Sequence, residues 1–282
     1  LFWKVGCMTI EKVINNNIVS AFDEIGREVV VMGCGIGFGS RPGAKIPEDK
    51  IEKIFRIESG SVADQFKELL AGVPLEHAKI SSDIISYAKG ALKLKLNQSI
   101  YVTLTDHINF AIARYAKGIN LENALLWEIK RFYPQEYELG KYAITQIKER
   151  LKVELPEDEA GFITLHIHSA LSDEDVEQSM TTARLVTESV AMIEEGMGIR
   201  IPVQSLGYNR LVSHLRYMIA RIRKGEPVSL DMESYAKESF PGPYQAAVDV
   251  CRNMEKRLGI TVASQEAAFL AIHIQRVREE GR

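Results

Sequence analysis

Four of the six histidines fall into two matched pairs, and a histidine ring can do chemistry that most side chains cannot. A shift of 107 residues along the chain brings each member of one pair onto a histidine of the other. The pairs are His107 with His166 and His214 with His273, and within each pair the two residues are 59 positions apart. The other two, His77 and His168, fall on non-histidine residues under this shift. The matched pairs are therefore the first candidates for a functional site.

A histidine on a half-apolar helix face is often only a packing residue. His107 shares a helix face with Leu104 and Ala111, so this interpretation applies here. Packing alone would also tolerate Asn, Gln or Tyr at such a position. Because both pairs are retained while most neighbouring residues differ, the pattern favours a chemical role.

Metal binding and acid–base catalysis fit the pattern less well. The HIH run at 166–168 suggests metal ligands, but the second copy reads HIQ and no HExxH motif occurs. Asp106 precedes His107, but Ser213 precedes His214, so no catalytic triad is repeated. We therefore expect no metal ion, no cofactor, no catalytic residue and no enzyme activity. A histidine-based metallohydrolase of tandem helical domains is the alternative.

Phosphorylation of the imidazole is the third chemistry. A neutral ring offers a nitrogen lone pair to phosphorus, and the product carries roughly two negative charges where there was none. Arg114 and Arg221, two turns after His107 and His214, are placed to receive that charge. On a packed face, the added charge would favour a different packing.

The elements that hold the histidines belong to an internal repeat. Under the same shift, LTDHINFAIARYAKG (104–118) falls on LVSHLRYMIARIRKG (211–225), and EAGFITLHI (159–167) on EAAFLAIHI (266–274). These segments carry apolar residues at helical spacing, and Pro134, Pro156, Gly118 and Gly140 separate the helices. The sequence predicts two homologous all-α helical-bundle domains, at 72–177 and 178–282.

The first part of the chain has a different pattern. TIEKVIN, NIVSAF and REVVVMG are short, rich in Val and Ile, and separated by turn residues. They predict a small antiparallel β-sheet of three to five strands at 1–63, with a linker to about residue 71. A sheet of this size needs to dimerise or dock on another element. Residues 1–7 form a possible extension, because Met8 is an alternative start.

Composition narrows the class of protein. The 282 residues are 46% hydrophobic with a net charge of −3, which gives no global basic signal for nucleic acid. The three cysteines, Cys7, Cys34 and Cys251, form no CxxC pair, so we expect a cytoplasmic protein. No apolar run is long enough to cross a membrane, and we expect no membrane insertion.

These features together resemble a known family. VINNNIV and VVVMGCGIGFG in the β region, followed by two helical repeats with two histidines each, resemble the BglG/SacY/LicT-type transcriptional antiterminators. The resemblance implies a co-antiterminator (CAT) RNA-binding domain followed by two phosphotransferase-system regulation domains (PRDs). It also implies a homodimer that binds an antiterminator RNA hairpin in the leader of a sugar-utilisation operon, of β-glucoside or sucrose type, and prevents termination.

The resemblance also assigns the phosphorylation sites and the proteins that act on them. It implies that the sugar-specific enzyme II acts on His107 and His166 and switches the protein off. It implies that the phosphocarrier HPr acts on His214 and His273 and favours the active dimer.

The same resemblance implies an RNA-binding set: Lys12, Asn15, Asn17, Gly33, Gly35 and Phe38. Asparagines can bind base edges, and an exposed Phe can stack on an unpaired base. Taken by themselves, NNN and the glycine run also fit a hairpin turn and a loop. Cys34 stands where the family usually has Arg or Lys, so we expect weaker or more salt-sensitive binding, or compensation by Arg27 or Arg41. Residues 8–57 are charge-neutral, and without a helix-turn-helix pattern a regulator that acts on DNA is disfavoured.

Overall fold

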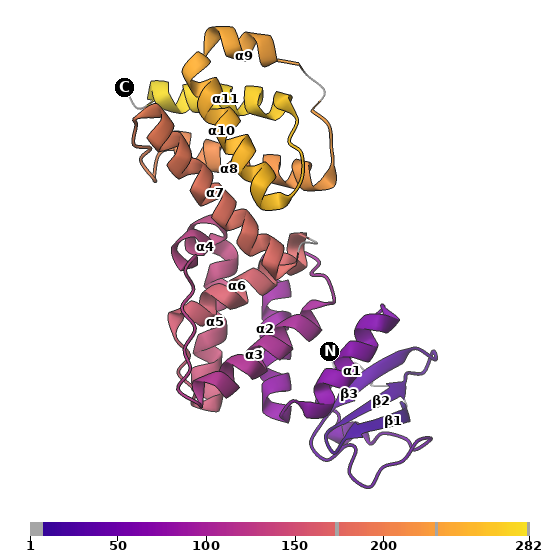
Figure 1. Ribbon diagram of the computed structural model, residues 1–282. Coiled ribbons are helices and arrows are strands. Elements are labelled where there is room, and N and C mark those ends of the chain that lie inside the picture. The colour runs from indigo at the N-terminus through magenta and orange to yellow at the C-terminus, as the bar shows by residue number, and fades with distance from the viewer. Residues whose placement is uncertain (1–7, 173–174, 229–230, 281–282) are drawn as a thin grey trace. The chain divides into compact units, whose positions relative to one another are not determined.

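The computed structural model describes residues 8–172, 175–228 and 231–280, so residues 1–7 lie outside the described part of the chain. It divides into two compact units, Leu1–Ser179 and Met180–Arg282. The first unit holds a sheet and helices α1 to α6, and the second holds α8 to α11 (Figure 1). Helix α7 begins in the first unit and continues into the second.

The strands are β1 (Thr9–Asn15), β2 (Ile18–Phe22), β3 (Glu28–Met32) and β4 (Lys53–Phe55). The helices of the first unit are α1 (Gly60–Gly72), α2 (Leu75–Leu92), α3 (Ile100–Tyr115), α4 (Leu126–Phe132), α5 (Pro134–Leu151) and α6 (Glu157–Ser172). The remaining helices are α7 (Val176–Met197), α8 (Leu206–Lys224), α9 (Glu233–Ser239), α10 (Pro241–Leu258) and α11 (Ser264–Glu280). A short 3-10 turn at Glu48–Lys50 precedes β4.

The sheet is antiparallel throughout, with strand order β1-β2-β3-β4. Side chains alternate between its faces, as the two-residue period of a strand requires. Val19, Val29 and Val31 pack on one face with Ile36 and Ile46 from the following loop. The prediction of a small antiparallel sheet is therefore confirmed, and both faces contribute to hydrophobic cores.

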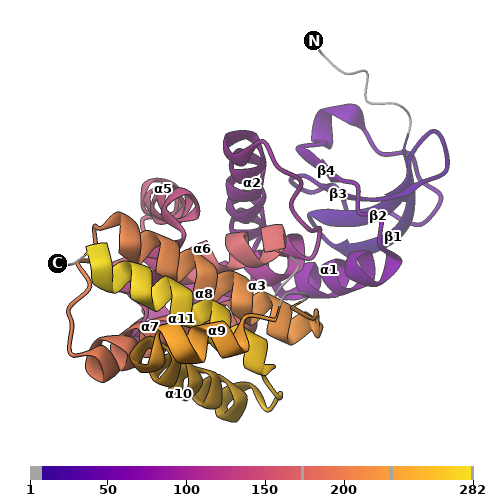
Figure 2. The same cartoon turned by 90° about the horizontal axis from the view of Figure 1, so that it is seen from above.

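The second face of the sheet is covered by α1. Ile18, Val30 and Met32 pack there against Phe66 and Leu70 of the helix. Helix α1 lies beside β1 and β2 (Figures 1 and 2). The marginal stability of so small a sheet is thus supplemented by burial against a helix of the same chain.

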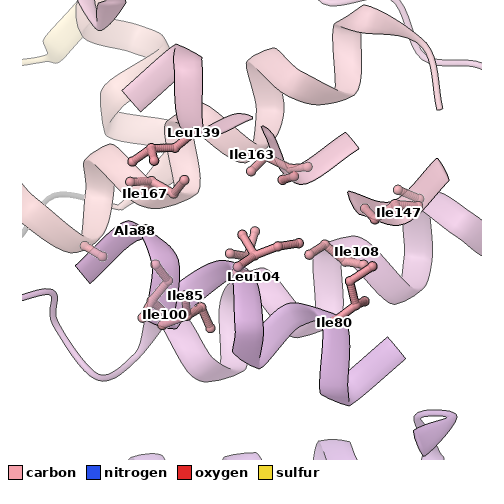
Figure 3. Close-up of a cluster of buried hydrophobic side chains, with 14 of the residues drawn as sticks. Ile80, Ile85, Ala88, Ile100, Leu104, Ile108, Leu139, Ile147, Ile163 and Ile167 are labelled. Carbon is pink, nitrogen blue, oxygen red and sulfur yellow. The ribbon is translucent and has the colours of Figure 1, made fainter. Parts of the chain in front are cut away.

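The first helical repeat, α2 to α6, is built around one apolar core. Leu104 and Ile108 of α3 and Ile163 of α6 project into it, with Ile80 from α2 and Ile147 from α5 (Figure 3). All of these side chains are buried, and they recur at three- and four-residue spacing along their helices. The core therefore fixes the faces of α3 and α6 that meet, which are the helices that carry the predicted histidines.

The second helical repeat, α7 to α11, follows the first in detail. A shift of 107 residues places α4 onto α9 and α5 onto α10, and the bounds of the helices coincide. Pro134 and Pro241 both occupy the first turn of their helices. The left-handed residue that ends each of these helices also matches, being Lys152 in one copy and Gly259 in the other. The predicted fold class, a small β domain followed by two homologous helical domains, is confirmed.

Candidate functional site

The first histidine pair forms where α3 and α6 pack together. His107 comes from α3 and His166 from α6, and their ring centroids are 4.7 Å apart with planes inclined by 39°. The Phe162 ring lies one turn before His166, 6.0 Å from His107. Both histidines are half-buried. Two rings that are 59 residues apart in sequence are thus in direct contact.

Burial keeps His166 uncharged at neutral pH. Burial, together with the neighbouring His107, lowers the pKa of His166 from 6.5 to about 3. Its Nδ1 atom is buried and has no hydrogen-bond partner. The ring is therefore a neutral imidazole, the form whose lone pair can attack phosphorus.

A buried carboxylate lies beneath this pair. Glu159 Oε1 accepts a hydrogen bond from Arg114 Nη2 at 2.6 Å, and Oε2 lies 3.0 Å from His107 Nε2. The latter contact is close but does not have the direction of a hydrogen bond. Burial raises the pKa of Glu159, but His107 and Arg114 more than offset this, so the pKa is lowered and the carboxylate is ionised.

The second repeat brings the same residue types together. His214 of α8 and His273 of α11 are stacked, with ring centroids 4.0 Å apart and planes inclined by 27°. Burial, His273 and Arg221 lower the pKa of His214 from 6.5 to about 3. Glu266 accepts two hydrogen bonds from Arg221, at 3.0 Å from Nε and 2.7 Å from Nη2. The His214 Nε2 atom is buried without a hydrogen-bond partner.

An open hollow of about 460 Å³ exposes this second pair. Its walls include both histidines, Tyr217, Arg210 and Arg276. The two arginines share one carboxylate, because Glu280 lies 2.9 Å from Arg210 and 3.6 Å from Arg276. An anionic group that enters the hollow therefore meets cationic side chains close to the rings.

The two unmatched histidines lie in different surroundings. Nδ1 of His77 is 2.9 Å from Asn109 Oδ1, and Nδ1 of His168 is 3.1 Å from Glu136 Oε1. Within the described residues neither ring contacts another histidine, and the His168 ring lies 3.9 Å from the Tyr133 ring. Within residues 8–172, 175–228 and 231–280, no group of three or more His, Cys, Asp or Glu side chains is arranged to hold a metal ion.

Glu159 and Glu266 are not among the site residues predicted from the sequence. They are the first residues of the matched segments EAGFITLHI and EAAFLAIHI, so the 107-residue shift contained the signal. A glutamate near the start of a helix is common, because it stabilises the helix dipole, and by itself it does not indicate a functional site. What distinguishes these two is burial, with only 4% and 3% of the side chain exposed.

Several predicted RNA-binding residues meet at one end of the sheet. Asn17 Oδ1 accepts a hydrogen bond from the Gly35 N–H at 2.9 Å, and Asn15 Oδ1 accepts one from the Asn17 N–H at 2.8 Å. The Asn15 side-chain amide donates to the Leu70 carbonyl of α1 at 2.9 Å. Asn15 therefore links this end of the sheet to α1, and the Nδ2 group of Asn17 remains as a donor.

The glycine-rich segment combines close buried backbone contacts, at Gly33 and Gly37, with an exposed tip. A side chain at Gly33 would lie 1.7 Å from the Lys50 carbonyl oxygen, so this glycine is required for packing. Gly35 has a φ of +65° with open space around it, so it is required by backbone conformation. Phe38 is 73% exposed. Cys34 is also exposed, and its N–H donates to Glu52 Oε1 at 3.1 Å.

Arg27 lies away from the other predicted RNA-binding residues, at the opposite end of the sheet. It precedes β3, and the register pairs Phe22 with Glu28 at that end, whereas Ile18 pairs with Met32 near the asparagines. Its guanidinium binds Asp23 at 2.9 Å. Lys12 is exposed midway along β1. The structure thus groups the asparagines and glycines with Phe38 and separates Arg27 from them.

Comparisons with known proteins agree with this architecture. The CAT RNA binding domain family matches residues 8–63, and the PRD domain family matches residues 82–170 and 187–277. Fold and site together define a regulatory protein with an RNA-binding domain and two histidine-bearing regulation domains. The chain belongs to the family of transcription antiterminators that combine a CAT RNA binding domain with PRD domains. This family consists of regulators, and nothing in it supports the metallohydrolase alternative.

The relatives match over nearly their whole length. "Transcription antiterminator LicT" from Bacillus subtilis is 40% identical over 96% of this chain and 99% of its own. "Beta-glucoside operon antiterminator" from Dickeya chrysanthemi is 38% identical over 97% and 98%. The crystal structure of GlcT CAT-PRDI has a TM-score of 0.52 and 41% identity, covering 59% of this chain and 99% of that one.

In the described parts of the chain, no helix is both long and apolar enough to cross a membrane.

Proposed function

We propose that this chain binds an RNA hairpin in the leader of a sugar-utilisation transcript and prevents termination, under the control of histidine phosphorylation in both PRDs. The relatives named for a β-glucoside operon and for antitermination support this choice of target. The observation that carries the control is the repeated contact between two histidines, one of them held neutral by burial, in each PRD.

The transfer step requires only a neutral acceptor ring. The lone pair of an unprotonated ring nitrogen forms a new phosphorus–nitrogen bond, while the phosphorus–nitrogen bond of a phosphohistidine donor breaks and its electron pair returns to the donor ring. The low pKa values of His166 and His214 keep such a lone pair available at neutral pH. HPr for His214 and His273, and a sugar-specific enzyme II for His107 and His166, are the proposed partners, in a cytoplasmic homodimer.

RNA recognition is proposed for the end of the sheet that carries Asn17 and Phe38. The Asn17 Nδ2 group is a donor for base edges, and the exposed Phe38 ring offers a stacking surface. Asn15, Gly33 and Gly35 shape this end through their contacts and backbone conformation. Lys12 supplies a positive charge nearby, and Arg27 contributes from its own end of the sheet.

The test combines phosphate mapping with a reporter. The full chain is incubated with enzyme I, HPr and phosphoenolpyruvate, with and without the sugar-specific enzyme II that the first PRD requires, and acid-labile phosphate is mapped by mass spectrometry. Label is expected on the matched histidines, and replacing all four by Ala is expected to abolish the response of antitermination to sugar supply. His77→Ala and His168→Ala are the matched controls. A reporter that responds normally without the four histidines contradicts the proposal.

A further inference from the structure

Each histidine pair lies next to an arginine that is bound to a buried carboxylate. Glu159 holds Arg114 at 2.6 Å in the first PRD, and Glu266 holds Arg221 through both oxygens in the second. The two pairs occupy matched positions under the 107-residue shift. Both copies of the repeat therefore share this arrangement.

These carboxylates are in a place where an unpaired charge is costly. Each glutamate side chain is almost fully buried, at 4% for Glu159 and 3% for Glu266. A buried carboxylate needs its cation, because removing one partner leaves an uncompensated charge in a low-dielectric environment. The arginine is thus held until another anion of at least equal strength comes within its reach.

A phosphorylated histidine would be such an anion. The Glu159 carboxylate is 3.0 Å from His107, so a phosphoryl group on that ring would come near both the carboxylate and the Arg114 guanidinium. Arg221 is close enough to lower the pKa of His214, after the larger effects of burial and His273. The phosphoryl group carries about two negative charges and has three acceptor oxygens, more than a carboxylate offers.

We propose that Glu159 and Glu266 are positioning residues that hold Arg114 and Arg221 beside the acceptor histidines, and that phosphorylation transfers each arginine from its carboxylate to the phosphoryl group. This inference rests on the proposed phosphorylation. The glutamate left behind is then a buried anion next to another anion, so the α3–α6 or α8–α11 contact must change. The ion pair between glutamate and arginine and the phosphohistidine are mutually exclusive.

The two PRDs differ in how exposed the arginine is and in how the glutamate contacts it. Arg114 is only 12% exposed and its guanidinium lies 4.9 Å from the Phe110 ring, whereas Arg221 is 30% exposed. Glu159 also divides its oxygens between Arg114 and His107, while Glu266 gives both to Arg221. The two-oxygen contact with Glu266 is the stronger ion pair, but the greater exposure of Arg221 lets its guanidinium reorient with less change in its surroundings, so the test is made in the second PRD.

The experiment measures phosphate on His214 and His273 in the full-length chain. Phosphoramidate, a small chemical phosphoryl donor, is used beside HPr so that docking of a protein donor does not decide the result. Glu266→Gln keeps the shape of the side chain but releases the guanidinium, so it is expected to raise the initial rate of phosphorylation about tenfold, the size of one charge-assisted hydrogen bond. Arg221→Gln is expected to lower the rate and to shorten the lifetime of the phosphohistidine.

The double variant separates positioning from a merely structural role. Because Glu266 acts through Arg221, the gain from Glu266→Gln is expected to disappear when Arg221→Gln is also present. Glu188→Gln, which breaks the 2.7 Å ion pair with Arg257 in the same unit, is the matched control and is expected to leave the rate unchanged. A Glu266→Gln rate at or below that of the native chain, or a gain that persists in the double variant, overturns the proposal.

A second measurement uses the native chain and does not depend on the folding of any variant. The Nε–H resonance of Arg221 is followed by NMR, because this atom donates to Glu266 at 3.0 Å. It is expected to move when phosphate is added to the histidines and to return when the phosphate is lost. An unchanged resonance at full phosphorylation overturns the exchange. A native chain that accepts no phosphate from either donor overturns the proposed function instead.

Discussion

His214 and His273 lie face to face, with ring centroids 4.0 Å apart and planes inclined by 27°. Two stacked imidazoles in this position cannot both be protonated without strong repulsion at short range. The pair is stable because burial keeps the rings neutral, which also keeps them nucleophilic. Stability and chemical readiness in the PRDs thus have the same physical origin.

Acid is expected to destabilise the second PRD through His214. The folded pKa is about 3 and the unfolded value about 6.5, so between these values the unfolded chain binds a proton that the folded chain does not. The free energy of unfolding therefore falls as the pH drops below 6.5, by up to about 1.4 kcal/mol per pH unit for one such group, and this term is absent above about pH 7. Urea unfolding at about pH 7 and about pH 5 measures it. His214→Gln is expected to flatten the dependence, and an equal slope in both proteins contradicts the assignment.

Loss of Arg114 is expected to destabilise the first PRD strongly. Arg114→Ala leaves the Glu159 carboxylate buried without its cation, which costs about 3–5 kcal/mol. Lys148→Ala is the control, because its pair with Glu154 is exposed and is worth less than about 1 kcal/mol. Chemical denaturation of both variants gives the comparison. Equal losses for the two would mean that Glu159 is stabilised by other groups.

Phe38 is expected to contribute to RNA affinity without contributing to stability. Its ring is 73% exposed, so Phe38→Ala is expected to weaken hairpin binding by about 1–3 kcal/mol, the value of one base–aromatic stack, with little change in thermal unfolding. Ile25→Ala is the matched control, since Ile25 is 70% exposed in the β2–β3 turn at the other end of the sheet. Fluorescence anisotropy with a labelled hairpin measures both. Equal effects from the two substitutions would remove Phe38 from the interface.

Alanine substitutions at the two glycines of the predicted RNA-binding set are expected to destabilise the protein for different physical reasons. Gly33→Ala places a carbon 1.7 Å from the Lys50 carbonyl oxygen, so the backbone must move, and the expected loss of stability is about 3 kcal/mol, the upper end of the usual range for overpacking. Gly35→Ala meets open space but keeps a φ of +65°, which costs about 1–2 kcal/mol. Thermal unfolding of the two variants tests the order. A milder effect at Gly33 than at Gly35 would contradict the close contact with Lys50.

Cys34→Arg is expected to strengthen RNA binding. The side chain is exposed at the glycine-rich segment, so a guanidinium there can neutralise a phosphate and steepen the dependence of affinity on salt by about one counterion. By the same argument the native Cys34 makes binding weaker and less salt-sensitive, so greater salt sensitivity is not expected from Cys34. Glu52, which accepts the Cys34 N–H and pairs with Lys79 at 2.6 Å, would compete for the new charge. Binding isotherms at several salt concentrations, with Cys34→Ser as the control, measure the gain. An unchanged affinity and salt slope would show that Glu52 retains the arginine.

The sequence by itself determined the repeat and therefore most of the architecture. Apolar residues at helical spacing predict the helices, and Pro134 and Pro241 mark matched helix starts. Both signals are local, so they can be found without knowledge of the tertiary structure. The paired positions of His107 with His166 and His214 with His273 were visible as well, because a shift of the sequence compares residues one by one. The strands β1 to β3 also followed from alternation and turn residues, whereas the three-residue β4 is too short to give such a signal.

Only the tertiary structure decided which of these residues touch. Whether His214 stacks on His273, or Glu266 lies under Arg221, depends on how α8 and α11 pack, and residues 45 to 59 positions apart are brought together by the whole core. The same is true of Gly33, whose requirement comes from the Lys50 carbonyl and not from its own backbone angles. Burial of a charge is likewise a property of the packed fold, because the residue type alone does not show whether a glutamate lies at the surface or in the interior.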